Sequence, residues 1–194
     1  FDEIEHRAAE LQIINGIGQV LTRQHDLYTM IDLVGDKLRE LVGEDNVGIG
    51  LYDPKTRITT THYVYKKDER LQTPSFILND FTYKAATQGK SLVFNKYSPR
   101  LWKRLGPQMT VNGQIPKSAV MVPLVVGNVL VGGISVQNFE REGAYSESFV
   151  KLLEFVASSM ATAIQNARLF EETKQRAAEL ATINTVSNAL AGTL

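Results

Sequence analysis

The stretch VPLVVGNVLVGGISVQN, at residues 122–138, decides the fold together with YSESFVKLLEFVASSMATAIQNARLFEE at residues 145–172. In the first stretch, two runs rich in Val and Leu flank Gly127-Asn128, a pair that favours the tight turn between antiparallel strands. The pattern therefore predicts a hairpin with strands at residues 119–126 and 129–137.

The second stretch predicts a long helix. Its apolar residues recur at steps of three and four, and it contains no proline. We expect this helix to begin at Glu147 and to continue without a break to Leu190.

Toward the N-terminus, the sequence predicts a second hairpin. Residues 46–52 and 57–65 have the composition of strands, and an Asp-Pro-Lys turn at residues 53–55 separates them. The other expected elements are a helix at 26–42 that Gly43 ends, a short strand at 75–78, a short helix at 80–88, a short strand at 91–94, and an irregular segment at 98–113 with one helical turn around Trp102. Since hairpins pair antiparallel and the long helices lie at the chain ends, we expect an α+β fold with helices packed on a central antiparallel sheet.

A repeat relates the two ends of the chain. The sequence RAAEL at residues 7–11 recurs at residues 176–180, and Ile-Asn at residues 14–15 recurs at residues 183–184, each after 169 positions. A repeat of this period suggests tandem domains, with the second copy as the first helix of a following domain. The alternative is a pair of similar amphipathic helices that pack on their own domain.

Both copies carry an apolar stripe that needs a partner, and a parallel dimer would supply one. We therefore expect a homodimer whose signalling helices form a coiled coil or bundle. The residues expected in these helices are Ile4, Leu11, Ile14, Phe170, Leu180, Ile183 and Leu190. The chain starts without Met and stops inside a helical pattern, so we expect it to be a fragment of a longer polypeptide.

The composition excludes several classes of function. Lys plus Arg and Asp plus Glu both number 21, so a chain without net charge has no global attraction for nucleic acid or an anionic membrane. The chain has no cysteine, which removes disulfides, thiolate catalysis, Cys-based zinc sites and a bilin linked through Cys. No apolar run is long enough to cross a bilayer, and we expect a cytoplasmic location without membrane contact. The three histidines are far apart, and we expect no metal site.

The two quoted stretches resemble a GAF domain. The resemblance lies in Pro123-Leu124, the turn at Gly127, the returning strand with Gly132, and the helix sequence Ala-Ile-Gln-Asn-Ala at residues 163–167. It extends back through the first hairpin and covers nearly the whole chain. The resemblance implies a small-molecule-binding or dimerisation module, often found in tandem in sensor histidine kinases, cyclases and phosphodiesterases.

The resemblance also implies how the chain is divided. Residues 1–25 would form an N-terminal signalling helix, residues 26–168 the GAF core with its last helix from about 147, and residues 169–194 a linker helix that leads to a following domain. This fragment would not be an enzyme. The full-length protein would be a bacterial signalling protein with a histidine kinase or nucleotide cyclase output, as in a two-component system.

The sequence departs from some members of the family. GAF domains that bind cyclic nucleotides tend to carry Asn-Lys after the last strand and then Phe-x-x-x-Asp-Glu, whereas this chain has Asn138-Phe139 and Phe149-Val150. The absence of Cys excludes the GAF-fold methionine sulfoxide reductases that use Cys nucleophiles. His62 lies in the middle of a strand, and we do not expect it to hold a haem. The identity of the ligand, and of any cofactor, stays open.

The resemblance places the ligand pocket under the segment before the second hairpin. Trp102 is a candidate lid for an anionic or aromatic ligand, and the alternative is an aromatic plug on a loop. The expected ligand-binding residues are Phe76, Phe81, Phe94, Leu101, Trp102, Ser118 and Val120. Core packing is the alternative for the apolar members, and a hydrogen bond to the backbone is the alternative for Ser118.

Three functions stay open. In the first, a ligand binds between the sheet and residues 76–118 and shifts the helices at residues 1–24 and 147–190, which biases an output domain. In the second, the domain binds nothing and serves as a dimeric spacer. The third is an enzyme, for which the sequence offers no nucleophile–base pair. A cavity of a few hundred Å3 would favour the first.

Overall fold

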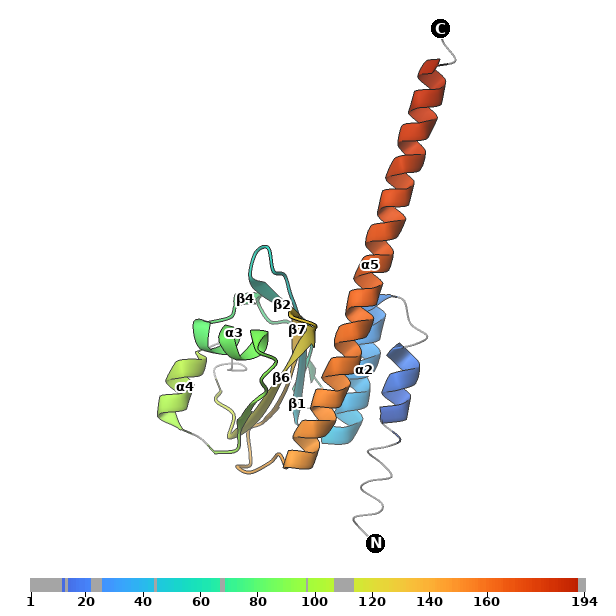
Figure 1. The fold of residues 1–194 in the computed structure, drawn as a ribbon. Helices are drawn as coiled ribbons and strands as arrows, with labels where there is room; N and C mark the ends of the chain where they lie inside the picture. Colours follow the sequence, from blue (N-terminus) through green and yellow to red (C-terminus); the bar gives the residue numbers. More distant parts are fainter. Residues whose placement is uncertain are drawn as a thin grey trace.

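A computed structural model describes residues 12, 14–21, 26–43, 45–66, 69–96, 98–106 and 114–191, with only the backbone of residues 102 and 186–191. The described residues form one antiparallel sheet with helices on both faces, and a long C-terminal helix extends away from it (Figure 1). Ile4 and Leu11 lie outside the described residues, as do the side chains of Trp102 and Leu190.

The sheet has seven strands, and every described pairing between them is antiparallel. Six strands follow the order β3-β2-β1-β7-β6-β5, and β4 pairs with β2 beside this path. The strands are β1 (Asn46–Tyr52), β2 (Ile58–Lys66), β3 (Glu69–Arg70), β4 (Phe76–Ile77), β5 (Leu92–Phe94), β6 (Ser118–Val126) and β7 (Val129–Asn138). Both predicted hairpins are confirmed, as β1–β2 and β6–β7.

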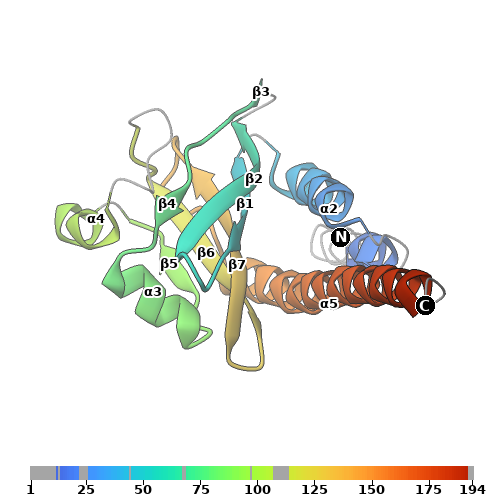
Figure 2. The ribbon, with the colours of Figure 1, turned by 90° about the horizontal axis from the view of Figure 1, so that it is seen from above.

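The helices lie on opposite faces of the sheet (Figure 2). On one face lie α2 (Leu27–Val42), α5 (Glu147–Ala191) and a helical segment at residues 14–21. On the other face lie the shorter α3 (Asp80–Thr87) and α4 (Pro99–Leu105). Among the described residues, no helix combines the length and the apolar character needed to cross a membrane.

The segment around Trp102 is more regular than the sequence analysis expected. Where one helical turn was predicted, α4 is a seven-residue helix. Ser98 precedes it and its Oγ accepts a hydrogen bond from the Leu101 backbone N–H at 3.4 Å. Pro99 then occupies the first helical position, where a missing N–H removes no helical hydrogen bond. These two residues together explain why the helix begins there.

The main core lies between the sheet and the helices α2 and α5. Alternate residues of β1, such as Val47 and Ile49, point into it and are fully buried. Gly35 of α2 lies directly over Tyr63 of β2, and a Cβ on this glycine would be 2.5 Å from the tyrosine ring. The absence of a side chain at this position therefore sets how closely α2 approaches the sheet.

A partly buried polar cluster joins the start of α5 to the sheet. The Asp45 carboxylate, which directly precedes β1, accepts hydrogen bonds from Asn138 Nδ2 at 2.6 Å and from the Tyr145 hydroxyl at 2.9 Å. Asn138 Oδ1 also accepts from the backbone N–H of Arg141 at 2.6 Å. Burial raises the pKa of Asp45, although both hydrogen bonds oppose the shift. Burial and the Asp45 charge raise the pKa of Tyr145 well above its ordinary range.

We expect Gly35→Ala to lower the free energy of unfolding by about 1–3 kcal/mol, because the methyl group would overlap the Tyr63 ring and force α2 outward. The matched control is Gly18→Ala, in the helical segment at residues 14–21, where a Cβ meets nothing within 4 Å. That substitution should raise stability by roughly 0.5–1 kcal/mol. Urea unfolding measures both, and an equal effect at the two positions would show that Tyr63 yields to the methyl group.

The raised pKa of Asp45 predicts a pH dependence. Its folded-state pKa lies above the unfolded value, so it contributes stability at low pH that is lost as the pH rises through the folded pKa. Wild type should therefore lose stability relative to Asp45→Asn between about pH 3 and about pH 7. The opposite trend is expected for Asp53→Asn, because hydrogen bonds from Thr56 and Lys55 lower the pKa of Asp53. Thermal unfolding across this range tests both, and parallel curves for wild type and Asp45→Asn would contradict the assignment.

Candidate ligand-binding site

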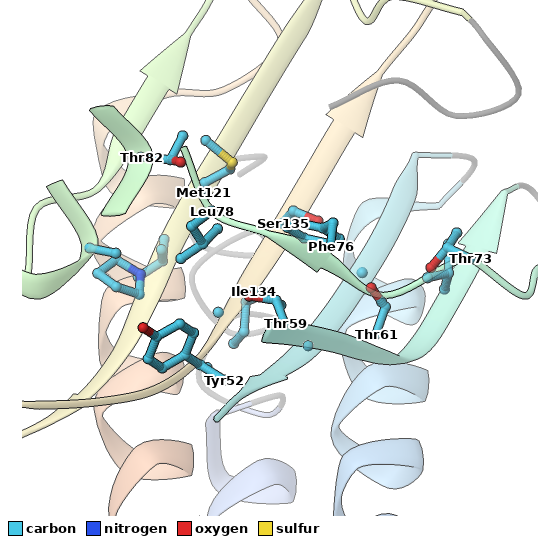
Figure 3. A pocket seen from close by; sticks show the side chains of 18 of the residues that line it. Tyr52, Thr59, Thr61, Thr73, Phe76, Leu78, Thr82, Met121, Ile134 and Ser135 are labelled. Carbon is cyan, nitrogen blue, oxygen red and sulfur yellow. The ribbon is translucent and has the colours of Figure 1, made fainter. Parts of the chain in front are cut away.

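A cavity of about 440 Å3 lies on the face of the sheet opposite α2 and α5. Its floor is the central part of the sheet, and its roof comes from residues 71–74, from β4 and from α3 (Figure 3). Side chains from β2, β4 and β6 converge on the same space. The cavity is thus enclosed between the sheet and the elements that connect the two hairpins.

The floor of the cavity is bare backbone because glycine occupies its central positions. Gly50 of β1 pairs with Gly133 of β7, and both line the cavity. Gly50 also pairs with Thr61, and Gly133 pairs with Pro123. One row across four strands therefore runs Thr61, Gly50, Gly133, Pro123, with no side chain at its two middle positions. The missing side chains leave room for the cavity.

Polar groups without a partner are found in the lining. The Nδ2 of Asn46, the Oγ1 of Thr59 and the Oγ1 of Thr73 are buried and have no hydrogen-bond partner. All three residues line the cavity, and they come from β1, β2 and the segment before β4. Each such atom costs roughly 1–3 kcal/mol, so a molecule that bonds to these atoms would stabilise the fold.

The rest of the lining is mostly apolar or neutral. Phe76, Leu78 and Met121 contribute large apolar side chains, and Thr82 and Ser135 contribute hydroxyl groups (Figure 3). Among the described lining residues there is no Asp, Glu, His, Cys or Arg, and the single charged one is Lys90, which is exposed. The described lining therefore suits binding by shape and hydrogen bonds.

Within the described part of the chain, no group of three His, Cys, Asp or Glu side chains is placed to hold a metal ion. His62 packs against Tyr28, with ring centroids 5.1 Å apart, and does not line the cavity. Partial burial, with the charge of Arg168, lowers its pKa. Tyr63 and Tyr145, whose pKa values are raised strongly, also lie outside the lining.

The structure separates the residues that the sequence analysis placed together. Phe76 lines the cavity. Phe81, Phe94 and Leu101 instead pack against Leu105 and Ala119 in a second apolar cluster, between the sheet and the helices α3 and α4. This cluster holds α4 against the sheet, and these three side chains do not line the cavity.

Two further candidates have structural contacts outside the cavity. Val120 points to the opposite face of the sheet and is fully buried in the main core. Ser118 Oγ donates to the Arg141 carbonyl at 2.9 Å and accepts from the Ala144 N–H at 3.3 Å, which matches the backbone-bonding alternative. The side chain of Trp102 lies outside the described residues, so its role as a lid stays a prediction.

Asn46, Thr59, Thr73 and the glycine floor were not predicted from the sequence. A signal for the floor was present in β1, where Asn46, Gly48, Gly50 and Tyr52 alternate with large apolar residues. Alternation places these residues on one face of a strand. A strand with glycine on one face and Val, Ile and Leu on the other marks a face that is not filled by side chains.

A family model of the GAF domain matches residues 24–165. Three solved structures are similar in fold. Residues 122 to 287 of a methyl-accepting chemotaxis protein are 17% identical, with 79% of this chain and 98% of that chain covered and a TM-score of 0.67. The GAF domain of an Acinetobacter phosphoenolpyruvate-protein phosphotransferase is 16% identical, with coverage of 82% and 94% and a TM-score of 0.69.

The third solved structure is that of a protein in a far-red absorbing dark state with bound biliverdin IXa. It is 19% identical to this chain, with 82% of this chain and 99% of that chain covered and a TM-score of 0.61. At these identities the likeness shows the fold alone. No curated protein matches the sequence of the chain.

The glycine floor predicts that an added methyl group is tolerated at Gly133 but destabilises the fold at the neighbouring Gly132. A Cβ on Gly133 would meet only the Val122 carbonyl oxygen, at an ordinary 3.6 Å, and would point into the cavity. A Cβ on Gly132 would overlap the carbonyl oxygen of Gly50 in the next strand. We expect Gly133→Ala to change the free energy of unfolding by less than about 1 kcal/mol, and Gly132→Ala to lower it by about 1–3 kcal/mol. Urea unfolding separates them, and equal losses would contradict an open space above Gly133.

Proposed function

Because this chain belongs to the GAF domain family, we propose that it is a sensory domain, which binds a small molecule in the cavity and transmits binding through its helices to an output domain. The observation that carries this proposal is a cavity of about 440 Å3 whose lining includes three buried polar atoms without a partner. Small-molecule sites have volumes of roughly 300–1,000 Å3. A ligand would satisfy these atoms, whereas a ligand-free spacer would be more stable with apolar residues in their place.

Two of the similar structures support a sensory role. One belongs to a methyl-accepting chemotaxis protein, and another holds biliverdin IXa in a far-red absorbing state. This chain has no cysteine, so a bilin could not be linked to it through a Cys thioether. We propose that its ligand is held without a covalent bond through cysteine.

The sheet offers a direct route from the cavity to the helices. The strands β1 and β7 carry the glycine floor on one face and core residues such as Ile49 and Val136 on the other. Those core residues belong to the same cluster as Leu153 and Met160 of α5. A ligand that shifts the floor would therefore move side chains that pack on α5, and a signal requires a ligand that favours one of two such packings.

The outer face of α5 supports a dimer. Phe155, Leu169 and Ile183 follow at intervals of 14 residues, which is two heptads, and so lie along one side of a coiled-coil helix. These large apolar side chains are 55%, 50% and 59% exposed. The C-terminal half of α5 extends beyond the sheet, where the described part of the chain does not cover it (Figure 1). We propose that a second copy of this helix covers the stripe, with the stripe of each copy against that of the other.

The wider setting is part of the same proposal. The domain would lie in the cytoplasm, in a tandem array of a bacterial signalling protein that ends in a histidine kinase or nucleotide cyclase. The repeat of RAAEL and Ile-Asn after 169 positions supports the array. The domain itself would not be an enzyme, because the described cavity lining lacks the carboxylate, imidazole and thiol groups from which a nucleophile–base pair is built.

Native mass spectrometry of the protein purified from cells, compared with the denatured chain, tests the ligand and the dimer together. We expect a dimer that carries added mass. The double variant Leu169→Glu with Ile183→Glu should be monomeric, because it places charges in the stripe. The matched control is Ala178→Glu with Thr185→Glu, which adds the same charge on another side of the exposed helix and should stay dimeric. A wild-type monomer would refute the dimer, and a dimer without added mass would favour the spacer.

A further inference from the structure

The lining of the cavity is poor in charge. Of the lining residues that the structure describes, only Lys90 carries a formal charge at neutral pH, and this lysine is exposed to water. A charged ligand that enters the cavity leaves water without meeting a buried counter-ion. The transfer of an unpaired charge into such a site costs several kcal/mol, whereas a neutral polar group needs only its hydrogen bonds.

The nearby helix N-terminus does not offset this lack of charge. The α3 helix begins at the cavity, but Asn79 closes it, since its Oδ1 accepts from the Thr82 N–H and hydroxyl at 2.9 Å each. The Nδ2 of Asn79 donates to the carbonyls of Arg104 and Leu105 at 2.9 and 2.7 Å, which holds the cap in place. An anion therefore cannot bond to the Thr82 N–H unless it displaces a side chain with four hydrogen bonds.

The floor of the cavity selects for shape. Gly50 and Gly133 lie side by side in the sheet, and Thr61 and Pro123 follow on either side of them. Bare peptide groups let a flat molecule approach the sheet more closely than any side chain would allow. A planar ring would therefore fit over Gly133 and extend toward Gly50, where the Thr59 methyl group borders the open space, 3.1 Å from the position of an added Cβ.

The volume limits the size of the ligand. A dry cavity of about 150 Å3 accommodates benzene, which has six carbon atoms. By this measure the cavity of about 440 Å3 would hold a molecule of about 18 non-hydrogen atoms. Two or three fused or linked rings meet this limit.

The polar edge of the ligand is expected beside β2. Thr59 and Thr61 are two residues apart on the cavity face of this strand, and Thr73 lines the same cavity from the segment before β4 (Figure 3). The hydroxyls of Thr59 and Thr73 are the ones that are buried without a partner. A hydroxyl can donate and accept, so this row suits a group that does both, such as an amide or a lactam.

We propose that the cavity binds an uncharged planar ligand of two or three rings, which stacks on Gly50 and Gly133 and bonds through an amide-like edge to the threonine row Thr59, Thr61 and Thr73. This assignment rests on the proposed function of the same cavity and adds the chemical class of the ligand.

Three probes of nearly one shape test the charge. Naphthalene-2-carboxamide is neutral, naphthalene-2-carboxylate is an anion, and naphthalene-2-carboxamidine is a cation. Isothermal titration should show that the carboxamide binds at least about tenfold more tightly than either ion, because the ions lose solvation without gaining a buried partner. Equal or tighter binding of the carboxylate or the amidine would overturn the assignment of an uncharged ligand.

Gly133→Leu tests the location. It fills the space above the floor, so it should abolish binding of the carboxamide. The matched control is Gly18→Leu, which makes the same change at an exposed helical position with nothing within 4 Å of the added Cβ, and it should leave binding intact. Circular dichroism confirms that each variant is folded.

Thr59→Val tests the threonine row with two readouts of opposite sign. When both proteins are free of ligand, Thr59→Val should melt at a higher temperature than wild type, because the substitution removes a buried hydroxyl that has no partner. It should also bind the carboxamide several-fold more weakly. The control is Thr60→Val, whose hydroxyl bonds to that of Ser75 at 3.1 Å and whose side chain points to the other face of the strand. This control should melt at a lower temperature and bind the carboxamide as wild type does.

The outcomes separate the ligand class from the site itself. If an ion binds best and Gly133→Leu abolishes that binding, the cavity is a ligand site and only the class is wrong. If no probe binds wild type, or if Gly133→Leu leaves the binding unchanged, the cavity is not the site and the proposed function fails with the class.

Discussion

The close contact between β1 and β7 at the centre of the sheet is the constraint on which the cavity depends. At Gly132 the carbonyl of Gly50 approaches so closely that a side chain has no room. One residue further, Gly133 and Gly50 leave the opposite face of the sheet without side chains. A large residue in place of Gly133 would fill the cavity from below, whereas a Cβ at Gly50 would first press on the Thr59 methyl group, at 3.1 Å. The hollow is therefore built into the sheet and does not arise from loose packing of the loops above it.

The two faces of this sheet differ in composition because one packs against helices and the other lines the cavity. One face packs Val, Ile and Leu side chains against α2 and α5 into an apolar core. The other face presents glycine, threonine and asparagine to a cavity in which three polar atoms have no partner. The polar cluster of Asp45, Asn138 and Tyr145 ties the end of β7 to the start of α5. These hydrogen bonds thus join the strands that form the floor to the helix that extends from the domain.

Much of the fold could be predicted from the sequence, but little of the site could. The hairpins, α2 and α5 depend on local patterns, such as the turn at Gly127-Asn128 or the glycine that ends α2. The site depends on which face each side chain takes after long-range pairing. Phe81 and Phe94 are aromatic and close in sequence to Phe76, yet they pack beneath α4 while Phe76 reaches the cavity. Nothing in composition separates these three rings.

The sequence by itself determined the antiparallel hairpins, the long final helix, the absence of thiol chemistry and the resemblance to the GAF family, because each is written in neighbouring residues or in composition. Only the tertiary structure decided that Gly50 lies beside Gly133, that Thr59 and Thr73 are left without partners, and that Val120 points away from the cavity. These relations join residues tens of positions apart, and a shift of one residue in strand register would reverse the face that each side chain takes.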